Sequence, residues 1–307
     1  MAKPVIKIGH LKITDHLALG LSVDKVEKGE ETFKYFDLEA KPYRGWNPLA
    51  EELRGGLIDG ACILAPIGME LFHSGKKFTM VLQMHKEGST IVVNKRANIK
   101  KLEDFKGKAV LIPHYLSAHH LLFDKLLRDS GYEIGPGKDA VFDVVAPADI
   151  LEIMEWDETG KVGGFIVAEP FGTQVIKQGL GEEFKLSKEI WPRHPCCVLV
   201  LKTELIETNP DAVHELVNSL IASGQSVRKD LNRSVEVGSK FLGQDIEVMR
   251  SVLGDPREKV SFHEMMPVLQ DFEFMQNYMT GPIQAMSGKI DMEKFVDLKF
   301  AQAAGAK

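Results

Sequence analysis

Short apolar, β-branched runs alternate with helix-like patterns along about the first two thirds of the chain. This alternation is typical of βαβ units and predicts a mostly parallel sheet covered by helices. After these runs the pattern is helical to the last residue. The runs that we expect to form strands are VIKIGHL (5–11), FKYFDLEA (33–40), DGACILAP (59–66), FTMVLQMH (78–85), STIVVNK (89–95), GKAVLIP (107–113), AVFDVVAP (140–147), GGFIVAEP (163–170) and CCVLVLKTELI (196–206).

The alternation occurs in two similar sections, and 307 residues are enough for two cores. We therefore predict an α/β protein of two Rossmann-like lobes around a central cleft. Two hinge strands, near 89–95 and 196–202, are expected to join the lobes. On this prediction lobe I consists of residues 1–93 and 200–307, and lobe II of residues 94–199.

Composition excludes several classes of protein. The net charge is −6 and the basic residues are scattered, so we expect no binding to nucleic acid. No apolar stretch approaches the ~18–20 residues of a membrane-spanning helix. The first residues, MAKPVIKIGHLKITDH, enter a strand pattern without an apolar signal core. We expect either a cytoplasmic protein or a mature chain whose export segment has been removed.

Four strand-to-helix corners are the expected places for a ligand, because ligands of open parallel sheets bind outside the carboxyl ends of the strands. The corners are KITDH (12–16), LAPIG (64–68), LSAHH (116–120) and AEPFG (168–172). Their candidate ligand-binding residues are Thr14, Asp15, His16, Ala65, Pro66, Ser117, Ala118, His119 and Glu169.

The third corner belongs to a stretch with three histidines. Ser117 is expected to cap a helix, so that free N–H groups and the positive helix end favour an anion there. A plain cap without a ligand is an equal alternative, and either His119 or His120 alone can simply pack or face solvent. The two are about 100° apart on a helix, which argues against a compact zinc site made by the pair. His114 precedes the cap and fits either interpretation.

Two carboxylates and one aromatic residue have two interpretations each. Asp15 and Glu169 each lie at a helix start, where a carboxylate either binds a cation or a ligand N–H or simply caps the helix. Trp46 either stacks on a ligand or packs against the helix that follows.

No enzyme signature is present. The chain lacks a phosphate-binding loop, a GxSxG elbow and an HExxH motif. Cys62, Cys196 and Cys197 do not form a disulfide framework and are expected to be small buried side chains. We therefore expect no catalytic residue, no cofactor and no metal site.

Four segments together resemble the periplasmic solute-binding proteins of nitrate/sulfonate/taurine-type ABC transporters, most closely the nitrate- and bicarbonate-binding branch. The segments are LKITDHLALGL, WNPLAEELRGGLIDGACILAPIG, LEDFKGKAVLIPHYLSAHHLL and GGFIVAEPFGTQVIKQGLGEEFKLSKEIWPRHP. The resemblance runs from about residue 5 to about residue 230. It implies the type II periplasmic-binding-protein fold, a monomer outside the cytoplasm, and an ABC permease as partner.

The resemblance also implies a non-catalytic receptor that binds a small solute in the cleft, such as nitrate, bicarbonate or a sulfonate. His119 matches the histidine that faces the anion in that branch, and the corners at Thr14-Asp15 and Glu169-Pro170 match positions that face the cleft. The expected ligand-binding set is Thr14, Asp15, His16, Trp46, Ala65, Pro66, His85, Ser117, Ala118, His119 and Glu169.

Pyrimidine-precursor enzymes of thiamin synthesis belong to the same superfamily and provide a second hypothesis. Such a cytosolic enzyme would hold a metal in a cleft rich in histidine and cysteine. Its ligands would come from His16, His85, His119 and the cysteines.

Overall fold

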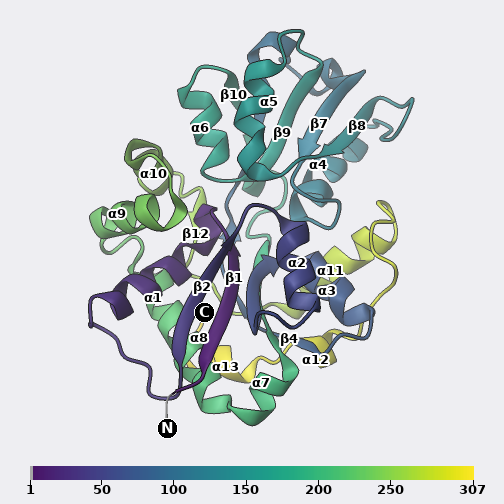
Figure 1. Cartoon of the computed structure of the whole chain (residues 1–307). Coiled ribbons are helices and arrows are strands. Elements are labelled where there is room, and N and C mark those ends of the chain that lie inside the picture. The colour runs from purple at the N-terminus through teal and green to yellow at the C-terminus, as the bar shows by residue number, and fades with distance from the viewer. Residues whose placement is uncertain (1–2) are drawn as a thin grey trace.

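The computed structural model describes residues 3–307, which form two five-stranded sheets (Figure 1). The first sheet has the order β2-β1-β3-β11-β4. β1 runs parallel to β2 and β3, whereas β11 runs antiparallel to both of its neighbours. Its strands are β1 (Val5–Leu11), β2 (Asp37–Tyr43), β3 (Gly60–Leu64), β4 (Phe78–Gln83) and β11 (Cys197–Lys202).

The second sheet has the order β10-β6-β9-β7-β8. β7 runs parallel to β8 and β9, and β6 runs antiparallel to β9 and β10. Its strands are β6 (Ser89–Asn94), β7 (Lys108–Ile112), β8 (Ala140–Val144), β9 (Val162–Ala168) and β10 (Gly181–Leu186).

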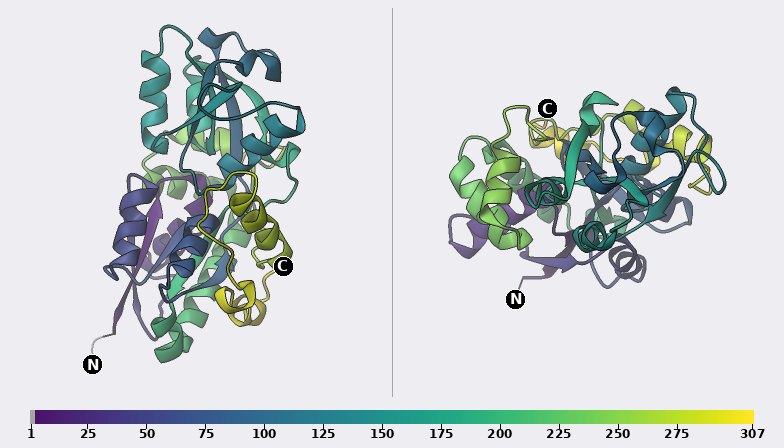
Figure 2. Two further views of the ribbon diagram at one scale, coloured as in Figure 1. Left: turned by 90° about the vertical axis from the view of Figure 1, so that its right-hand side faces the viewer. Right: turned by 90° about the horizontal axis from the view of Figure 1, so that it is seen from above.

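Helices cover each sheet and complete two lobes stacked along the long axis (Figure 2). Lobe I contains the first sheet with α1 (Leu17–Glu27), α2 (Trp46–Arg54), α3 (Ala65–His73), α7 (Thr203–Thr208), α8 (Pro210–Ser226), α9 (Leu231–Leu242), α10 (Ile246–Leu253), α11 (Leu269–Thr280), α12 (Met292–Phe295) and α13 (Lys299–Ala303). Lobe II contains the second sheet with α4 (Ala118–Asp129), α5 (Ile150–Trp156) and α6 (Phe171–Lys177). The two-lobed α/β fold expected from the sequence is confirmed.

The chain passes between the sheets at 84–88 and 187–196. The strands expected to join the lobes are ordinary members of single sheets: β6 pairs only within lobe II and β11 only within lobe I, among the described residues. Both are buried along almost their whole length, and their ladder partners lie in one sheet each. We therefore propose lobe boundaries at these passages, a few residues before the expected 93/94 and 199/200.

A third connection between the lobes comes from residues 246–261, which we call the C-terminal bridge. Its helix α10 packs against α6, and its short strand β12 (Val260–Ser261) pairs with β5 (Lys86–Glu87) in the first passage. The Lys177 ammonium donates to the Glu247 carbonyl at 2.8 Å. The bridge thus attaches the helical C-terminal part of lobe I to lobe II.

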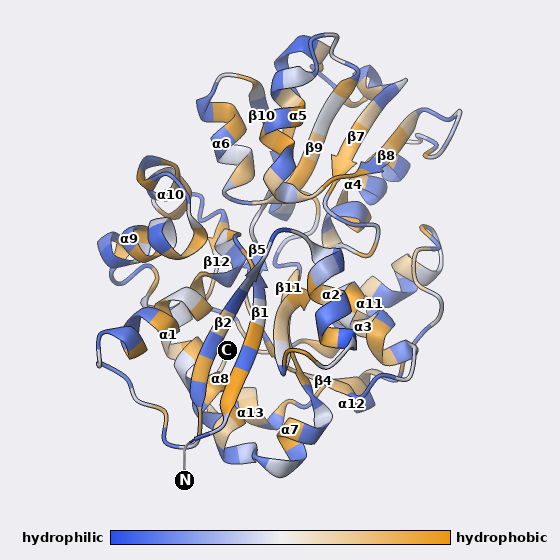
Figure 3. Ribbon diagram, viewed as in Figure 1, coloured by the Kyte–Doolittle hydropathy of each residue, from blue (hydrophilic) through white to orange (hydrophobic). Residues whose placement is uncertain are grey.

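The apolar strands supply the core of each lobe. In Figure 3 the strands inside the sheets are largely orange, the edge strand β2 is banded with blue, and the helices carry blue bands on their outer faces. Every residue of β3, β4 and β6 is buried, as expected for strands covered on both sides. Within residues 3–307 no helix is both long and apolar enough to cross a membrane.

Candidate functional site

The corner after β1 forms a short 3-10 turn, Thr14–His16, that is completely buried. Helix α1 begins only at Leu17, so neither Thr14 nor Asp15 caps it. The Thr14 N–H donates to the Glu169 carbonyl at 2.8 Å, which joins this corner of lobe I to the corner after β9 of lobe II. Two of the four expected corners therefore meet directly.

His16 has one unpaired ring nitrogen at this corner. Its Nδ1 lies 3.0 Å from both the N–H and the carbonyl oxygen of Leu11, so Nδ1 can accept or donate, and Nε2 takes the complementary role. Burial holds the pKa of His16 well below its usual range and keeps the ring neutral. The indole of Trp46 lies edge-on to it, with the ring centroids 6.0 Å apart. The corner thus offers an unpaired imidazole nitrogen and an indole N–H.

His85 and Asp15 form a completely buried pair, with 3.1 Å between Nε2 and Oδ2. Burial raises the pKa of the Asp15 carboxyl against the attraction of His85. Burial opposes the imidazolium of His85, but the attraction of Asp15 and their hydrogen bond outweigh it and raise the pKa of His85 to about 10. Both shifts have the same meaning, because each favours keeping one proton between the two groups at neutral pH.

The two adjacent cysteines lie against this pair. The Cys197 thiol is 3.9 Å from Oδ2 of Asp15. A hydrogen bond with the Cys197 thiol is the main cause that lowers the pKa of the Cys196 thiol, against the opposing effect of burial. A hydrogen bond with His85 is the second cause. Burial raises the pKa of Cys197. Ala65, the first residue of α3, donates its N–H to the Cys196 carbonyl at 3.0 Å, and so places the corner at Ala65 and Pro66 beside the cysteines.

Glu169 is held by protein donors. Its carboxylate accepts hydrogen bonds from Thr90 Oγ1 at 2.8 Å, from the N–H of Thr173 at 2.9 Å and from the Thr173 hydroxyl at 3.0 Å. The Lys259 ammonium of the C-terminal bridge lies 2.8 Å from Oε1. This carboxylate therefore connects lobe II to the bridge, and protein donors already satisfy it.

The histidine stretch separates into three roles. Ser117 caps α4, as the sequence predicts, by accepting the His120 N–H at 3.0 Å. His120 packs against Phe142, and its Nδ1 lies 2.9 Å from the Tyr115 carbonyl. His114 reaches lobe I, where its Nε2 lies 3.0 Å from the Asn47 side-chain oxygen.

His119 differs from its neighbours because it is 1% exposed and both of its ring nitrogens lack a hydrogen-bond partner within residues 3–307. Burial, followed by repulsion from His194 and His85, lowers the pKa of His119 to about 3. His119 is therefore neutral and has hydrogen-bonding capacity on both nitrogens.

Several other buried polar atoms share this property, and most come from segments at the edges where the two sheets face each other. The buried side-chain atoms that find no partner in the described part of the chain are Thr14 Oγ1, Asp15 Oδ1, His16 Nε2, Trp46 Nε1, Gln83 Oε1, His85 Nδ1, Ser89 Oγ, His119 Nδ1 and Nε2, and Ser234 Oγ. We call all of these except Ser234, which lies in α9, the unpaired interlobe atoms. Six of the residues expected from the sequence contribute to them: Thr14, Asp15, His16, Trp46, His85 and His119.

A recess of about 330 Å³ lies between the lobes and is lined by residues of both. Lobe I lines it with the ends of β1 and β2, and lobe II with the start of α6 and the turn before α5. The lining residues are Leu11, Lys12, Ile13, Pro42, Tyr43, Arg44, Pro147, Ala148 and Phe171. Ion pairing between Arg44 and Asp149, at 2.6 Å, closes its rim.

Sequence reasoning missed Ser89, Gln83, Lys259 and the position of the two cysteines. Ser89 begins a strand that otherwise has an apolar pattern, and Lys259 lies in a region with a helical pattern, so no local signal marks either. The pairing of Cys196 and Cys197 with His85 depends on both interlobe passages meeting in space.

The two lobes and their sheet topology form the fold of the periplasmic binding proteins. The chain belongs to the NMT1-like family, whose sequence profile matches residues 2–237. It is 26% identical over 247 residues to the nitrate/nitrite binding protein NrtA of Nostoc, covering 74% of this chain and 54% of that protein. It is also 26% identical over 233 residues to the nitrate import ATP-binding protein NrtC of Synechocystis, covering 70% and 34%. The chain thus spans about half or less of the length of these curated relatives.

Solved structures share the fold over nearly the whole chain. The ligand-binding component of an ABC-type import system from Staphylococcus aureus, solved with zinc bound, has a TM-score of 0.86, 25% identity and 99% coverage of both chains. The periplasmic nitrate-binding protein NrtA of Synechocystis has a TM-score of 0.85 and 16% identity, with 98% of this chain and 88% of that chain covered. The alkanesulfonate-binding protein SsuA of Xanthomonas axonopodis has a TM-score of 0.79 and 16% identity, with 97% and 100% covered.

Proposed function

We propose that this protein is the solute receptor of an ABC importer and binds a small oxyanion, such as nitrate, bicarbonate or the head of a sulfonate, between its lobes. One observation carries the proposal: the unpaired interlobe atoms are buried where the lobes meet. A buried polar group without a partner costs about 1–3 kcal/mol, so several together are costly unless a ligand supplies the missing hydrogen bonds. The names of the relatives support the class of solute.

The chemistry of these atoms favours an anion held by neutral donors. Trp46 Nε1 donates, His119 donates from one ring nitrogen, and His16 Nε2 and the hydroxyls of Thr14 and Ser89 adapt to either role. The positive end of α4 adds to this potential, since His119 lies in its first turn. The Asp15 carboxyl does not oppose an anion strongly, because it shares a proton with His85.

The role is that of a receptor without a catalytic step. The expected site residues Ala65, Pro66, Ser117, Ala118 and Glu169 shape the corners rather than present unpaired atoms. On this proposal the protein acts outside the cytoplasm as a monomer, and the closed pair of lobes is the form that a permease recognises. These are the partner and location that the family resemblance implies.

Thermal unfolding tests the proposal. Ligand-stripped protein is heated with nitrate, nitrite, bicarbonate, taurine, alkanesulfonates or pyrimidine precursors, because a ligand of the folded state raises the Tm with its concentration. We expect a shift with one small anion or sulfonate. A shift with a pyrimidine precursor alone, or with none of these compounds, would contradict the proposal.

A conservative variant makes the test specific. Trp46→Phe keeps an aromatic ring and removes only the indole N–H, so it should weaken anion binding by about 5–10-fold, the value of one hydrogen bond of about 1–1.5 kcal/mol. Trp156→Phe is the matched control, since Trp156 is 72% exposed on lobe II. Equal binding by both variants would show that Trp46 does not contact the solute.

A further inference from the structure

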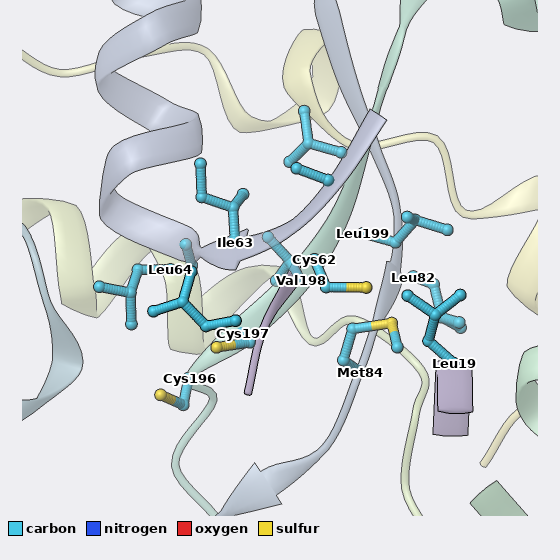
Figure 4. Packing of buried hydrophobic residues seen from close by; sticks show 14 of the residues in the cluster. Leu19, Cys62, Ile63, Leu64, Leu82, Met84, Cys196, Cys197, Val198 and Leu199 are labelled. Atoms are coloured by element: carbon cyan, nitrogen blue, oxygen red, sulfur yellow. The ribbon is translucent and has the colours of Figure 1, made fainter. Parts of the chain in front are cut away.

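Four side chains with metal-binding atoms meet at the junction of the lobes. Asp15 comes from the corner after β1, His85 from the first interlobe passage, and Cys196 and Cys197 from the end of the second passage and the start of β11. One ligand atom from each lies within 4.8 Å of all the others, and all four residues are buried. Figure 4 shows the sulfur atoms of the two adjacent cysteines on one side of the strand, with that of Cys62 pointing the other way.

Independent features indicate that this cluster is open to a ligand. Asp15 Oδ1 and His85 Nδ1 are fully buried and have no hydrogen-bond partner anywhere in residues 3–307. Gly88 keeps the space beside them free, because a Cβ there would lie 2.8 Å from Asp15 Oδ1 and 3.3 Å from His85 Nδ1. Its φ of +97° is a conformation that only glycine adopts readily.

The set of donor atoms selects one class of cation. Two sulfurs, one imidazole nitrogen and one carboxylate oxygen suit tetrahedral Zn²⁺, whereas Ca²⁺ and Mg²⁺ prefer oxygen ligands only. Bond lengths of about 2.0–2.3 Å place tetrahedral ligand atoms about 3.3–3.8 Å apart. The observed spread of up to 4.8 Å therefore requires side-chain movements of about 1 Å.

We propose that Asp15, His85, Cys196 and Cys197 form a binding site for Zn²⁺ or another thiophilic divalent cation. Binding displaces the two thiol protons and the proton held between Asp15 and His85 to solvent, and the cation takes their place. The ion then joins both interlobe passages to the corner after β1, so it fixes the lobes in their closed arrangement. This site is separate in its ligands from the donors of Trp46, His16 and His119, and it does not depend on which solute they bind.

Metal titration of the full-length protein tests the site. Protein treated with a chelator and a reductant is titrated with Zn²⁺ against a competing chromophoric chelator, and the metal retained after dialysis is measured by elemental analysis. We expect one Zn²⁺ per chain, with a higher Tm in its presence. The Cys196→Ala and Cys197→Ala variants should each bind Zn²⁺ at least about 100-fold more weakly, because loss of even an outer partner costs about 10–100-fold.

Cys62→Ala is the matched control, since Cys62 is an equally buried thiol outside the cluster. It should retain wild-type affinity for Zn²⁺. Far-UV circular dichroism identifies any variant that fails to fold. If a cysteine variant fails to fold, its affinity for Zn²⁺ cannot be compared with that of the wild type, and the test is then whether Zn²⁺ protects the wild-type thiols from an alkylating reagent. Wild-type protein without a tightly bound Zn²⁺, or Cys196→Ala and Cys197→Ala variants that retain it, would overturn the proposal.

Loading with Co²⁺ gives a readout of the ligands themselves. Thiolate-to-Co²⁺ charge transfer absorbs in the near ultraviolet, and its intensity follows the number of thiolates bound. We expect each single cysteine variant of the cluster to lose about half of this absorption, and His85→Ala to keep it at weakened affinity. Absorption that does not change in the cysteine variants would place the metal elsewhere and refute the assignment.

Discussion

Replacing His119 by leucine separates a solute-binding histidine from a structural one. The imidazole is buried and has no protein partner within the described chain, so an apolar side chain of similar size removes a buried polar group and no protein hydrogen bond. We therefore expect His119→Leu to be at least as stable as the wild type at pH 7.5, with a gain of up to about 1–3 kcal/mol. Binding of the anion should be lost at the same time.

The pH dependence provides the quantitative part. The pKa of His119 is about 3 in the folded protein and 6.5 in its usual state, so the unfolded chain binds a proton that the folded protein refuses. The free energy of unfolding is therefore unaffected by His119 above pH 6.5, and it decreases as the pH falls from 6.5 towards 3. Since pH 5 lies about 1.5 units below 6.5, the wild type should lose about 2 kcal/mol there through this residue. The variant should not lose it.

Urea unfolding at pH 7.5 and pH 5, with and without the anion, measures both effects. His120→Leu is the control on the same helix, because it loses the contact with the Tyr115 carbonyl and should be destabilised by about 1 kcal/mol at pH 7.5. The reasoning fails if His119→Leu is destabilised by more than about 2 kcal/mol and keeps the wild-type loss between the two pH values. That result would mean that the folded protein already satisfies the imidazole.

Three further substitutions have expected outcomes in the same urea assay. Glu169→Gln leaves the buried Lys259 ammonium without its nearest carboxylate and should lower the free energy of unfolding by about 3 kcal/mol. The double variant with Lys259→Met should recover most of this loss, and losses of the two single variants that simply add would contradict a coupled pair. Gly88→Ala should lower the free energy of unfolding by about 1–3 kcal/mol and by more than Gly75→Ala. Both glycines have a positive φ, but only at Gly88 would the new Cβ lie within 4 Å of other atoms. Equal losses would leave backbone strain as the sole cause. Arg44→Ala removes an exposed ion pair between the lobes and should change stability by less than about 1 kcal/mol, an effect that salt should reduce further; a larger loss would mean that the rim stays closed without solute.

The sequence predicts the two α/β units because their periodicity is local. The predicted ends of strands are less accurate where tertiary packing decides them. The run FKYFDLEA (33–40) was expected to be a strand, but β2 begins at Asp37, since Phe33 and Phe36 stack on each other at 4.4 Å and pack into the core from the preceding loop. An aromatic-rich run is compatible with either arrangement, and only the register with β1 selects between them.

The site was predictable at the corners and not beyond them. Strand ends mark Thr14, Asp15 and His119 because topology brings such ends together. Asp15, His85, Cys196 and Cys197 come from distant segments of the chain, so no local spacing of cysteine and histidine marks their cluster. Glu169 was placed correctly at the edge of its sheet, but its partner Lys259 comes from a segment with no local signal.

The C-terminal bridge determines how the two lobes can separate. Beyond the two passages, Lys259 and Arg257 of the bridge pair with Glu169 and Glu183 of lobe II, so this side resists separation. Away from the bridge, the lobes are joined by the exposed ion pair of Arg44 and by the contact between His114 and Asn47, and the Tyr278 hydroxyl donates to Asp124 at 3.0 Å. We propose that the lobes open by rotation about an axis along the bridge, which breaks these contacts and leaves the bridge side almost stationary.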